Sequence, residues 1–418
     1  MKQTIAIIGA GIVGTWTAYE AHCQGHDVII IEPDMPGGEQ SASFGNAAWI
    51  YEGSLLPIST PGLWREVPSY LLDPLGPFTV KWSYLPHVAP WLIKFVRAGN
   101  SIEKIEICAR ARRAILTDTL SRYEAMALDL GLGRYVQRNG LLFVFPSRAE
   151  YEKEALGIRI RKSYGLQWEE WDRGELHERE PELGPSYQFG AFHPYGGNLL
   201  NPSGFIAASV AALQQRGVRL VKAPAFNFAI ENGQLKGVVS DQELIACDRA
   251  IITSGARSAG LSLKAGDRIP LETERGYHLV VKNPAVIPNH PLMPSDGKMG
   301  VTMTDVGLRL AGQVELAGLN APPDWRRADI MRTYLERLLP RAAAHIKETT
   351  RWMGHRPSTP DGLPCIGPAR DCASIFYGYG HGHSGIGMAP GTARLLVELA
   401  SGQKPSIDPS PFSAERFR

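Results

Sequence analysis

A short segment near the N-terminus, IAIIGAGIVG (residues 5 to 14), constrains the fold more than any other part of the chain. Its apolar residues predict a buried strand that leads directly into a turn containing Gly9, Gly11 and Gly14. A strand, a glycine-rich turn and a helix in this order bring bare backbone N–H groups, at the positive end of the helix, against a pyrophosphate. The segment therefore predicts the phosphate-binding turn of a dinucleotide-binding domain.

The residues that follow complete this pattern. Thr15 to Gln24 predict a helix rich in small residues, and Val28 to Ile31 predict a second buried strand. That strand ends at Glu32, which lies 21 residues after Gly11, where a carboxylate meets the 2′-hydroxyl of an adenosine ribose. The alternative, a tight strand-to-helix turn that binds nothing, is disfavoured by this complete context.

Length, charge and cysteine content narrow the class of protein. The chain has 418 residues, enough for two or three domains and for an enzyme. Its 44 basic and 42 acidic residues nearly cancel, so the net charge favours neither nucleic acid nor another polyanion as a partner. The five cysteines are scattered without a C-x-x-C pair, which predicts neither a disulfide framework nor a zinc site and favours a reducing compartment.

Neither a signal peptide nor a membrane span is predicted. The first strand begins by Thr4, and no apolar run approaches the ~18 residues that a membrane helix needs. We therefore expect a cytoplasmic protein. Residues 84 to 100, YLPHVAPWLIKFVRAGN, allow two interpretations: a buried helix of a second domain, which we favour, or a peripheral contact with the inner face of the membrane.

The later segments predict domains that are interleaved along the chain. A strand from Arg249 to Thr253 runs into Gly255 and Ala256, which indicates a return to the first sheet. Near the C-terminus, GYGHGHSGIG is a second glycine-rich turn that runs into a helix. Other predicted elements are single helices over 101–130, 202–215, 324–349 and 385–400, a buried strand over 140–146, an antiparallel meander from residue 226 that turns at Asn232-Gly233, and strand-like alternation over 271–317.

Two glycine-rich turns, one at each end of the chain and each followed by a helix, suit a long dinucleotide that carries a redox ring. FAD fits this arrangement better than NAD, because the second helix N-terminus would stabilise the reduced flavin ring. Outside the C-terminal glycine-rich turn the chain has no second G-x-G-x-x-G motif, so we predict no separate NADPH domain. The electrons then come from an organic substrate.

Over almost its whole length the sequence resembles the D-amino acid oxidase superfamily of flavoproteins, especially its bacterial D-amino acid dehydrogenase branch. The segments that carry the resemblance, in family order after IAIIGAGIVG, are SASFGNAA (41–48), RAIITSGARSAGL (249–261), PLETERGYHLVV (270–281), WMGHRPSTPDGLPCIGPA (352–369) and GYGHGHSGIGMAPGTARLLVELASG (378–402).

The resemblance implies an α/β fold, in which an FAD-binding Rossmann-type domain of the glutathione-reductase kind is interleaved with a substrate domain of antiparallel sheet plus helices. On this basis we assign residues 1–60, 193–270 and 350–418 to the FAD-binding domain and residues 61–192 and 271–349 to the substrate or cap domain.

The resemblance also implies which residues hold FAD. The first turn would bind the pyrophosphate and Glu32 would bind the ribose. The loop from Ser41 would run over the flavin, and backbone groups near Phe226 would bind adenine. The cysteine to which the sarcosine-oxidase branch attaches its flavin is absent from Trp352-Met353-Gly354, so noncovalent FAD is expected. The implied set is Gly9, Ala10, Gly11, Ile12, Val13, Gly14, Glu32, Pro33, Ser41, Ser43, Asn46, Ala47, Phe226, Gly255, Ala256, Gly354, Gly382, His383, Ser384, Gly385, Ile386 and Gly387.

On the substrate side, Arg356 stands where the arginine of the family forks onto a substrate carboxylate, and a planar guanidinium suits that two-point contact. An ion pair at the surface or between domains is the alternative for Arg356. Tyr277 and His278 lie in the strand on the substrate side of the flavin, where either would hydrogen-bond the substrate or ease loss of its amine proton. His381 and His383 lack a third clustered ligand and predict no metal site.

The resemblance thus implies an FAD-dependent oxidoreductase that oxidises a small amino acid, either a D-amino acid or a D-proline-type secondary amine. Hydride transfer from Cα to the flavin would give an imine that hydrolyses to a 2-oxo acid or stays cyclic. The electron acceptor is a quinone, an electron carrier or O2, and no residue decides among them. Two alternatives stay open: a glycine or sarcosine oxidase, and a flavin-binding subunit of a larger dehydrogenase complex. The sequence leaves the oligomeric state open.

Overall fold

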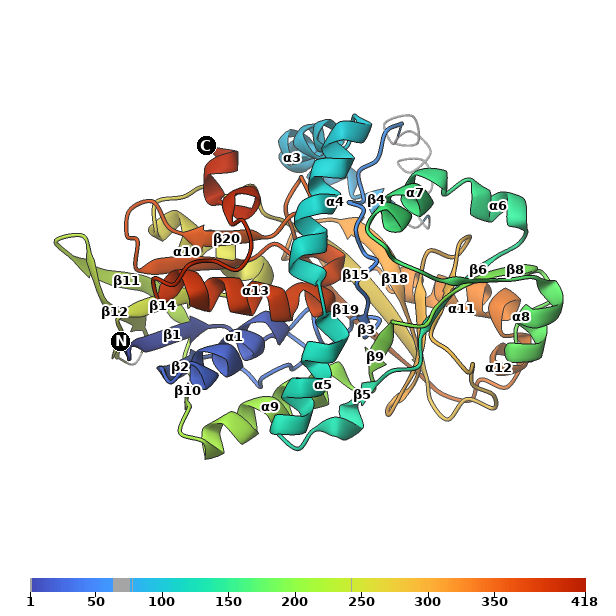
Figure 1. The fold of residues 1–418 in the computed structure, drawn as a ribbon, viewed down its shortest axis with the longest axis horizontal. Helices are drawn as coiled ribbons and strands as arrows, with labels where there is room; N and C mark the ends of the chain where they lie inside the picture. The colour runs from blue at the N-terminus through green and yellow to red at the C-terminus, as the bar shows by residue number, and fades with distance from the viewer. Residues whose placement is uncertain (1, 63–75, 77, 242) are drawn as a thin grey trace.

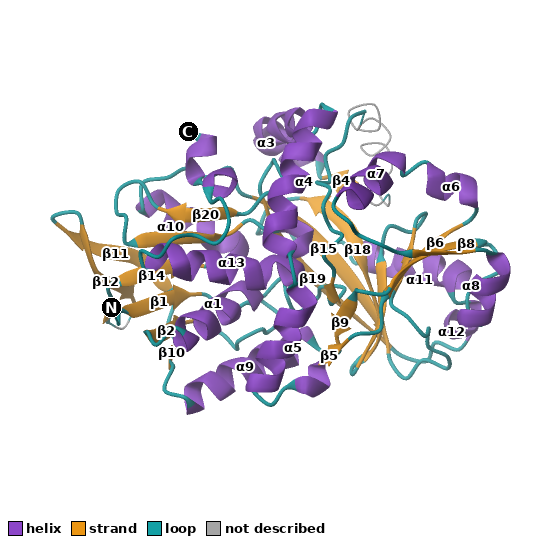
Figure 2. Ribbon diagram, in the orientation of Figure 1, coloured by secondary structure: helices purple, strands orange, loops and turns teal. Residues whose placement is uncertain are grey.

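Two large β-sheets organise the chain, and they lie on either side of helices α4 (Ile102–Leu116) and α5 (Thr119–Asp129) in Figure 1. The computed structural model describes residues 2–62, 76, 78–241 and 243–418. Helices flank the first sheet, at the end that carries the N-terminus, and line the outer side of the second (Figure 2).

The first sheet is the parallel sheet that the N-terminal segment predicts. Its strands in spatial order are β10 (Arg219–Val221), β2 (Asp27–Ile31), β1 (Thr4–Ile8), β14 (Arg249–Ile252), β21 (Ile375–Tyr379) and β20 (Cys365–Pro368). Every neighbouring pair is parallel except the last. The central strands are continuous apolar runs because both faces of the sheet are buried.

Different layers cover the two faces of this sheet. Helices α1 (Ile12–Cys23) and α13 (Gly385–Ala400) pack on one face. A three-stranded antiparallel sheet packs on the other, made of β11 (Ala225–Glu231), β12 (Gln234–Ser240) and β13 (Leu244–Ala246). This small sheet is the meander predicted from the sequence, and it turns at Asn232 and Gly233, which both have positive φ.

In the described part of the chain, the second sheet has nine strands and is largely antiparallel. Eight of them are, in spatial order, β19 (Thr349–Ser358), β15 (Glu272–Val281), β18 (Gly307–Leu316), β17 (Gly300–Thr304), β16 (Leu292–Pro294), β6 (Leu141–Phe145), β8 (Phe189–His193) and β7 (Glu169–Trp171). The ninth, β4 (Phe78–Val80), pairs with β18. Helix α11 (Arg326–Leu338) packs its apolar residues on one face of this sheet, and the opposite face turns toward the parallel sheet.

The other described elements connect and flank these sheets. They are the short strands β3 (Trp49–Ile50), β9 (Gly197–Leu199) and β5 (Val136–Gln137), the helices α3 (Leu85–Ala98), α6 (Arg148–Glu152), α7 (Ala155–Ser163), α8 (Arg173–Arg179), α9 (Pro202–Gln215), α10 (Ser258–Lys264) and α12 (Pro340–Ala344), and the 3-10 helices η2 (Trp82–Tyr84), η3 (Gly133–Tyr135), η4 (Gly255–Arg257), η5 (Gly382–Ser384), η6 (Ser410–Phe412) and η7 (Ala414–Phe417).

Two segments that we predicted as single helices each form two helices. Residues 101–130 form α4 and α5, because Thr117 is extended and Asp118 has φ 58°, which breaks the helical path. Residues 324–349 form α11 and α12, because Leu339 precedes Pro340 and adopts a non-helical conformation.

The sheets confirm the predicted fold class and the interleaving of its parts. Each sheet draws strands from distant parts of the chain, and β14 returns beside β1 as the strand-then-glycine pattern predicts. The division into residue ranges stays a proposal. Helix α13 and all of β19 except Thr349 lie in the range 350–418, and α4 lies in the range 61–192. However, β19 belongs to the nine-stranded sheet and α4 packs with α13, so these contacts cross the proposed domain boundaries.

The segment from residue 84 to 100 forms α3, which buries Trp91 and Phe95 as the buried-helix interpretation predicts. Ile93 of this helix is exposed. No helix in the described part of the chain is long and apolar enough to cross a bilayer. A peripheral membrane contact through α3 stays an untested prediction.

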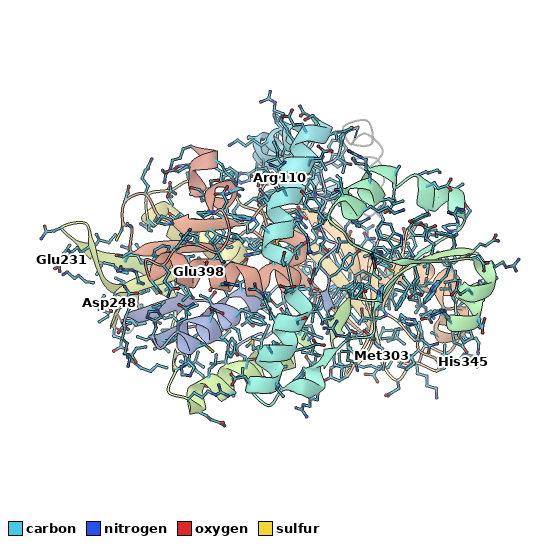
Figure 3. The ribbon with its side chains drawn as sticks, in the orientation of Figure 1. Arg110, Glu231, Asp248, Met303, His345 and Glu398 are labelled. Atoms are coloured by element: carbon cyan, nitrogen blue, oxygen red, sulfur yellow. The ribbon has the colours of Figure 1, made fainter. Side chains whose placement is uncertain are left out.

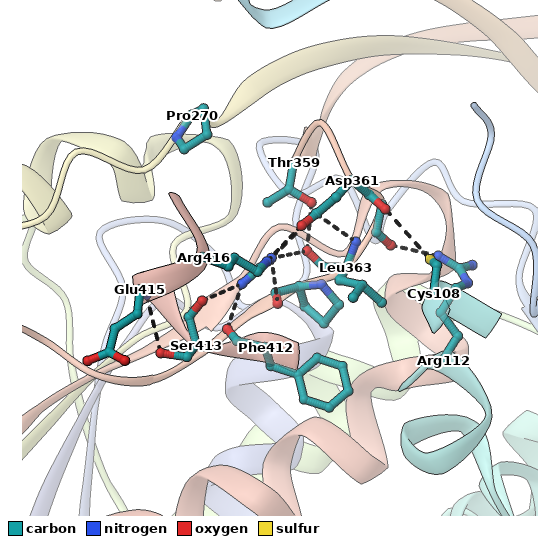
Figure 4. Close-up of polar contacts among 12 residues, drawn as sticks. Cys108, Arg112, Pro270, Thr359, Asp361, Leu363, Phe412, Ser413, Glu415 and Arg416 are labelled. Atoms are coloured by element: carbon teal, nitrogen blue, oxygen red, sulfur yellow. Dashed lines mark hydrogen bonds and ion pairs between the residues drawn. The ribbon is translucent and has the colours of Figure 1, made fainter. Parts of the chain in front are cut away.

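The C-terminal segment fastens the loop that connects β19 to β20. Arg416 Nε donates to Asp361 Oδ2 at 2.7 Å, and its Nη2 donates to the carbonyl oxygens of Leu363 at 2.7 Å and Pro364 at 3.1 Å (Figure 4). The same guanidinium binds the Phe412 carbonyl oxygen within the C-terminal segment. One side chain therefore ties the end of the chain to the connection between the two large sheets.

We expect Arg416→Ala to lower the free energy of unfolding by about 1–3 kcal/mol, because several partly buried acceptors lose their donor. Arg110→Ala is the matched control, since Arg110 lies on the exposed side of α4 (Figure 3) and surface changes stay within about 0.5 kcal/mol. Thermal unfolding at saturating FAD measures both. An equal shift for the two variants would contradict the fastening role.

Candidate active site

The first glycine-rich turn leaves no room for side chains. Gly9 has φ +107°, and a Cβ at Gly14 would lie 1.9 Å from the Gly9 carbonyl oxygen, so α1 begins directly against the end of β1. The N-cap residue Gly11 makes no side-chain capping bond, and the first turn of α1 holds no acidic residue. The positive end of α1 is therefore left to an anionic ligand.

A buried carboxylate lies beside this turn. Glu32 follows β2, and its Oε2 accepts a hydrogen bond from the backbone N–H of Ala10 at 2.8 Å. Its Oε1 accepts one from the N–H of Asp34 at 3.2 Å. Burial raises the pKa of Glu32, and these two backbone bonds oppose the rise. The arrangement fixes an acceptor next to the glycine turn, where a ribose hydroxyl requires one.

The loop of residues 41–48 runs from this turn toward the second sheet. Ser43 Oγ accepts a hydrogen bond from the N–H of Ile12 at 3.2 Å, which ties the loop to the start of α1. At the other end, Arg309 Nη1 donates to the carbonyl oxygen of Asn46 at 3.0 Å. The loop is therefore held from both sheets.

The second glycine-rich turn forms η5 and the start of α13. Ser384 is the N-cap residue of α13 and makes no side-chain cap bond to it, and the first turn of α13 has no acidic residue. Helix α5 fixes this turn, since Tyr123 donates to the carbonyl oxygen of Ile386 at 2.9 Å and Thr119 to that of Gly387 at 2.7 Å. A second helix N-terminus is thus firmly placed.

A cavity of about 890 Å³ lies between the loop 41–48, the inner face of the nine-stranded sheet and the start of α13. This volume is within the range of small-molecule and cofactor sites. Much of the lining is apolar, and helix α3 supplies one wall. The lining includes Trp49, Tyr51, Val80, Leu92, Phe95, Val96, Met293 and Trp352 among apolar and aromatic residues, and Asn46, Gln313, Arg356, His383 and Ser384 among polar ones.

Arg356 extends from β19 across the neighbouring strand β15 into this lining. Its Nη1 donates to the carbonyl oxygen of Gln313 at 2.8 Å and its Nη2 to that of Gly312 at 3.1 Å. A Cβ at Gly276 would lie 2.3 Å from the Arg356 Cζ, so only glycine lets the guanidinium lie over β15. Burial lowers the pKa of Arg356 to about 10, and the group stays charged at neutral pH.

A bulge in β18 aims these two carbonyl oxygens at Arg356. The pairing of β15 with β18 shifts between Arg275 and Tyr277, because β18 has one residue more than its partner there. Gln313 lies in this bulge with φ 59°, a left-handed conformation that is strained for a residue with a side chain. The strained residue, Gln313, is thus one of the two residues whose carbonyl oxygens hold the Arg356 guanidinium.

A histidine and a carboxylate form a short hydrogen bond next to Arg356. His383 Nε2 and Glu274 Oε2 are 2.6 Å apart, the carboxylate is almost fully buried and the imidazole is 36% exposed. Burial raises the pKa of Glu274, but His383 and Arg356 outweigh this and hold it below its ordinary value. Burial and Arg356 lower the pKa of His383, against the opposing effect of Glu274. At neutral pH the pair is therefore a carboxylate and a neutral imidazole.

Comparison with known protein families identifies the family to which this chain belongs. A profile of the family described as FAD dependent oxidoreductase matches residues 4–399. The chain belongs to this family. FAD is accordingly its cofactor.

Relatives and solved structures agree with this assignment. The chain is 44% identical to a D-amino-acid oxidase of Bradyrhizobium diazoefficiens over 99% of this chain and 98% of the relative. It is 28% identical to a D-amino acid dehydrogenase of Rhizobium rhizogenes over 99% of each chain. Glycine oxidase from Geobacillus kaustophilus shares the fold with a TM-score of 0.75 at 19% identity, covering 99% of this chain and 98% of that one. L-proline dehydrogenase from P. horikoshii shares it with a TM-score of 0.76 at 19% identity, covering 100% and 98%.

The residues of this oxidoreductase fit FAD. Gly9 and Gly14 have no Cβ to clash with the neighbouring backbone, so α1 begins directly against β1. Glu32 offers acceptors beside this turn, and two helix N-termini carry no acidic side chain in their first turns. Gly9 to Gly14 and Glu32 would hold the adenosine diphosphate part. The loop 41–48 and the start of α13, which both line the cavity, would hold the flavin.

The structure brings most of the predicted FAD-binding residues to these places. Ser41 and Ser43 lie over Gly11, and Gly255 follows β14 beside the first turn, since Thr253 and Ser254 contact Gly9 there. Phe226 lies on β11 with a mostly exposed ring, so its backbone role toward adenine stays a prediction. The predicted residues that line the cavity are Asn46, Ala47, Gly354, Arg356, His383, Ser384 and Gly387.

The structure does not place Tyr277 at the cavity, contrary to our expectation. Neighbouring residues of a strand point to opposite faces, and Gly276 faces the cavity, so Tyr277 points to the other side. Its hydroxyl donates to Glu315 Oε2 at 2.7 Å and accepts from the N–H of Asp324 at 3.0 Å. Tyr277 therefore braces β15 against β18 and α11.

His278 lies on the cavity side of β15 but beneath the loop 41–48. Its ring stacks on Trp352 and on Phe44, and its Nδ1 lies 3.4 Å from the carbonyl oxygen of Gly45. Burial lowers the pKa of His278 to about 3, so the ring is neutral. The structure gives His278 a supporting contact with the loop and no place in the cavity lining, so the catalytic role that we predicted stays a prediction that this placement does not support.

Sequence reasoning missed Glu274, Gly276 and the bulge at Gly312 and Gln313. Glu274 and Gly276 belong to the segment PLETERGYHLVV that drew attention to Tyr277, and alternation along β15 places them on the face opposite Tyr277. In the structure Glu274 pairs with Arg356 across β15 and β19, which identifies the face that carries the site. The sequence does not show this pairing. No sequence pattern predicts the bulge in β18.

We expect Gly276→Ala to weaken substrate binding about tenfold, because the added Cβ displaces the Arg356 guanidinium. Gly133→Ala is a control in which a Cβ meets nothing within 4 Å. Steady-state KM together with the flavin-to-protein absorbance ratio distinguishes the two. An unchanged KM in Gly276→Ala would show that the guanidinium position does not matter.

Proposed function

We propose that this oxidoreductase oxidises a D-amino acid with an apolar side chain. The observation that carries the proposal is Arg356, whose guanidinium reaches the lining of a largely apolar cavity and is held there by two backbone carbonyl oxygens. The relative with 44% identity, named a D-amino-acid oxidase, supports the substrate class.

Arg356 binds the substrate carboxylate. A guanidinium has five N–H donors, and its two bonds to the β18 bulge leave others for an incoming carboxylate. Charge-assisted paired bonds of this kind fix orientation as well as energy. A carboxylate on Arg356 sets where Cα lies in the cavity, and such positioning can supply ~7–11 kcal/mol of a barrier.

The apolar lining receives the side chain of the substrate. Trp49, Tyr51 and Met293 line the cavity together with the polar residues around Arg356, and Phe95 and Val96 of α3 contribute further apolar lining. These surfaces favour an aliphatic or aromatic side chain over a charged one, because a buried charge without a partner is costly. They also exclude water from the reacting carbon.

FAD, bound between the two glycine-rich turns, supplies the acceptor for a hydride from Cα. The residues of the chain bind, orient and shield the substrate for this transfer. We propose that FAD is held without a covalent bond, because no cysteine occupies Trp352-Met353-Gly354. Release of all flavin on acid precipitation of the protein tests this point.

An anaerobic substrate panel tests the function. The purified yellow protein is mixed without oxygen with D- and L-enantiomers of apolar, polar and charged amino acids, and with D-proline, glycine and sarcosine. We expect apolar D-amino acids to remove the flavin absorbance, and their L-enantiomers to leave it unchanged. A protein that no D-amino acid reduces would contradict the proposal.

We propose O2 as the electron acceptor, on the support of the relative named an oxidase. The oxygen-consumption rate with an apolar D-amino acid is expected to match the rate of 2-oxo acid formation. Turnover that requires a quinone or a dye, with no oxygen consumption, would favour the dehydrogenase function that the more distant relative's name indicates.

A further inference from the structure

The cavity holds one side chain that is suited to receive a proton near neutral pH. Its other ionisable lining groups are Arg97, Lys298, Arg356 and Tyr51, among the residues that the structure describes. The first three are cations, and burial raises the pKa of Tyr51 to about 12. Among the described residues that line the cavity, His383 alone combines exposure to the cavity with a carboxylate partner.

An amino acid arrives with a positive ammonium group, and the nitrogen lone pair must be free before Cα can lose a hydride. Arg356 fixes the carboxylate end of such a substrate under the proposed function. His383 and Arg356 both line the cavity, and Glu274, the partner of His383, lies directly opposite Arg356 in the pairing of β15 with β19. A small substrate whose carboxylate lies on Arg356 therefore has the imidazole of His383 on the same side of the cavity.

We propose that His383, oriented by Glu274, accepts the ammonium proton of the bound amino acid and makes the amine ready for oxidation. This inference rests on the proposed function. It assigns to His383 the amine-side role that the sequence suggested for Tyr277 and His278, neither of which lines the cavity.

The tautomer of His383 follows from its partner. Glu274 is a carboxylate that only accepts, so the neutral imidazole donates its Nε2–H to Glu274 Oε2. The remaining nitrogen, Nδ1, then carries the lone pair, and no group in the described part of the chain hydrogen-bonds to it. The carboxylate thus fixes the tautomer and stabilises the imidazolium that forms.

The proton step balances within the site. The N–H bond of the substrate ammonium breaks and an N–H bond forms on Nδ1 of His383, which leaves a neutral amine and an imidazolium beside the Glu274 carboxylate. Oxidation of this neutral amine at Cα, for which bound FAD would supply the hydride acceptor, would give an iminium. Water later hydrolyses the iminium, and the imidazolium returns its proton to solvent.

The pH dependence has a defined sign. The charged groups that face His383 are Glu274 on β15, Arg356 on β19 and Arg112 on α4. Burial and the two arginines keep the pKa of His383 below its ordinary value, although Glu274 raises it. The neutral, accepting form therefore prevails at pH 7, and the rate falls as pH drops through this low pKa.

Anaerobic stopped-flow reduction between pH 5.5 and 10 with an apolar D-amino acid tests the inference. In His383→Gln, the reduction rate at pH 7 should fall about 10²- to 10³-fold. It should then rise tenfold per pH unit up to the pKa of the free substrate ammonium, where the variant approaches the wild type. A loss of equal size at every pH would assign a purely structural role to His383 and overturn the proposal.

Binding of butanoate, a carboxylate without an amine, separates this inference from the proposed function. Its Kd, measured by the change in the flavin spectrum, should stay within twofold in His383→Gln and rise in Arg356→Lys. A wild type that no amino acid reduces would overturn the proposed function together with this inference. A wild type that is reduced, beside a His383→Gln variant with an unchanged rate at pH 7, would overturn this inference alone.

Glu274→Gln provides a second variant that keeps a hydrogen-bonding group against His383. Without the carboxylate the imidazole is a weaker base, so the rate at pH 7 should fall about tenfold and the low-pH limb should move to lower pH. Glu272→Gln is the matched control, since Glu272 is a buried carboxylate on the same strand that binds Tyr84 away from the cavity. Equal profiles for the two variants would contradict the role of Glu274.

Discussion

Replacement of Arg356 by lysine is expected to raise the Kd of an amino acid or of butanoate about 10²-fold, with FAD still bound. Lysine keeps the charge but loses the planar fork, so it can serve either the β18 carbonyl oxygens or the ligand with far poorer geometry. Loss of one hydrogen bond to a charged group costs ~1.5–3 kcal/mol, and each 1.4 kcal/mol is about tenfold in affinity.

Arg351→Lys is the control for this prediction. Arg351 lies on the same strand, β19, but at its exposed end, where it pairs with Asp329. Surface ion pairs contribute little, so substrate affinity should not change. If Arg356→Lys bound the carboxylate as tightly as the wild type, the guanidinium would have no part in recognition and the proposed function would lose its main support.

Gly14→Ala is expected to give a protein that does not retain FAD. The added Cβ would lie 1.9 Å from the Gly9 carbonyl oxygen and 2.7 Å from Thr253 Oγ1, and the Gly9 carbonyl cannot move away without separating α1 from β1. The turn that places the helix N-terminus against the pyrophosphate would then be lost. We expect a colourless protein with lower thermal stability that excess FAD does not restore.

Gly260→Ala is the control for this second prediction. Gly260 lies within α10, and a Cβ there meets nothing within 4 Å. Alanine is the better helix former, so FAD content should stay the same and stability should not fall. Far-UV circular dichroism confirms that each variant is folded, and the flavin-to-protein ratio reports FAD. A fully yellow Gly14→Ala would contradict the placement of the dinucleotide.

Local patterns were sufficient to predict the parts of the fold that depend on neighbouring residues. Helix α9 begins after Asn201, whose side chain accepts from the Gly204 N–H, and it was predicted with the correct bounds. The glycine turn followed from spacing alone. The break at Asp118 could not be predicted, because an aspartate adopts positive φ only under the constraint of its surroundings.

The candidate site was predictable only in part, since its key relations cross the sheet. Arg356 was found by resemblance, but its partners Gly312 and Gln313 come from a bulge 43 residues earlier that no sequence pattern marks. Tyr277 was assigned to the wrong face, because motif membership does not tell which of two adjacent residues points inward. The pairing of Glu274 with His383 likewise joins residues that are 109 positions apart.

A crystal structure of the FAD-bound enzyme with butanoate tests the central claim most directly. We expect the carboxylate to lie on the Arg356 guanidinium in two hydrogen bonds, with its alkyl chain against the apolar wall of the cavity. A carboxylate bound elsewhere, with the Arg356 guanidinium turned away from the flavin, would contradict the account.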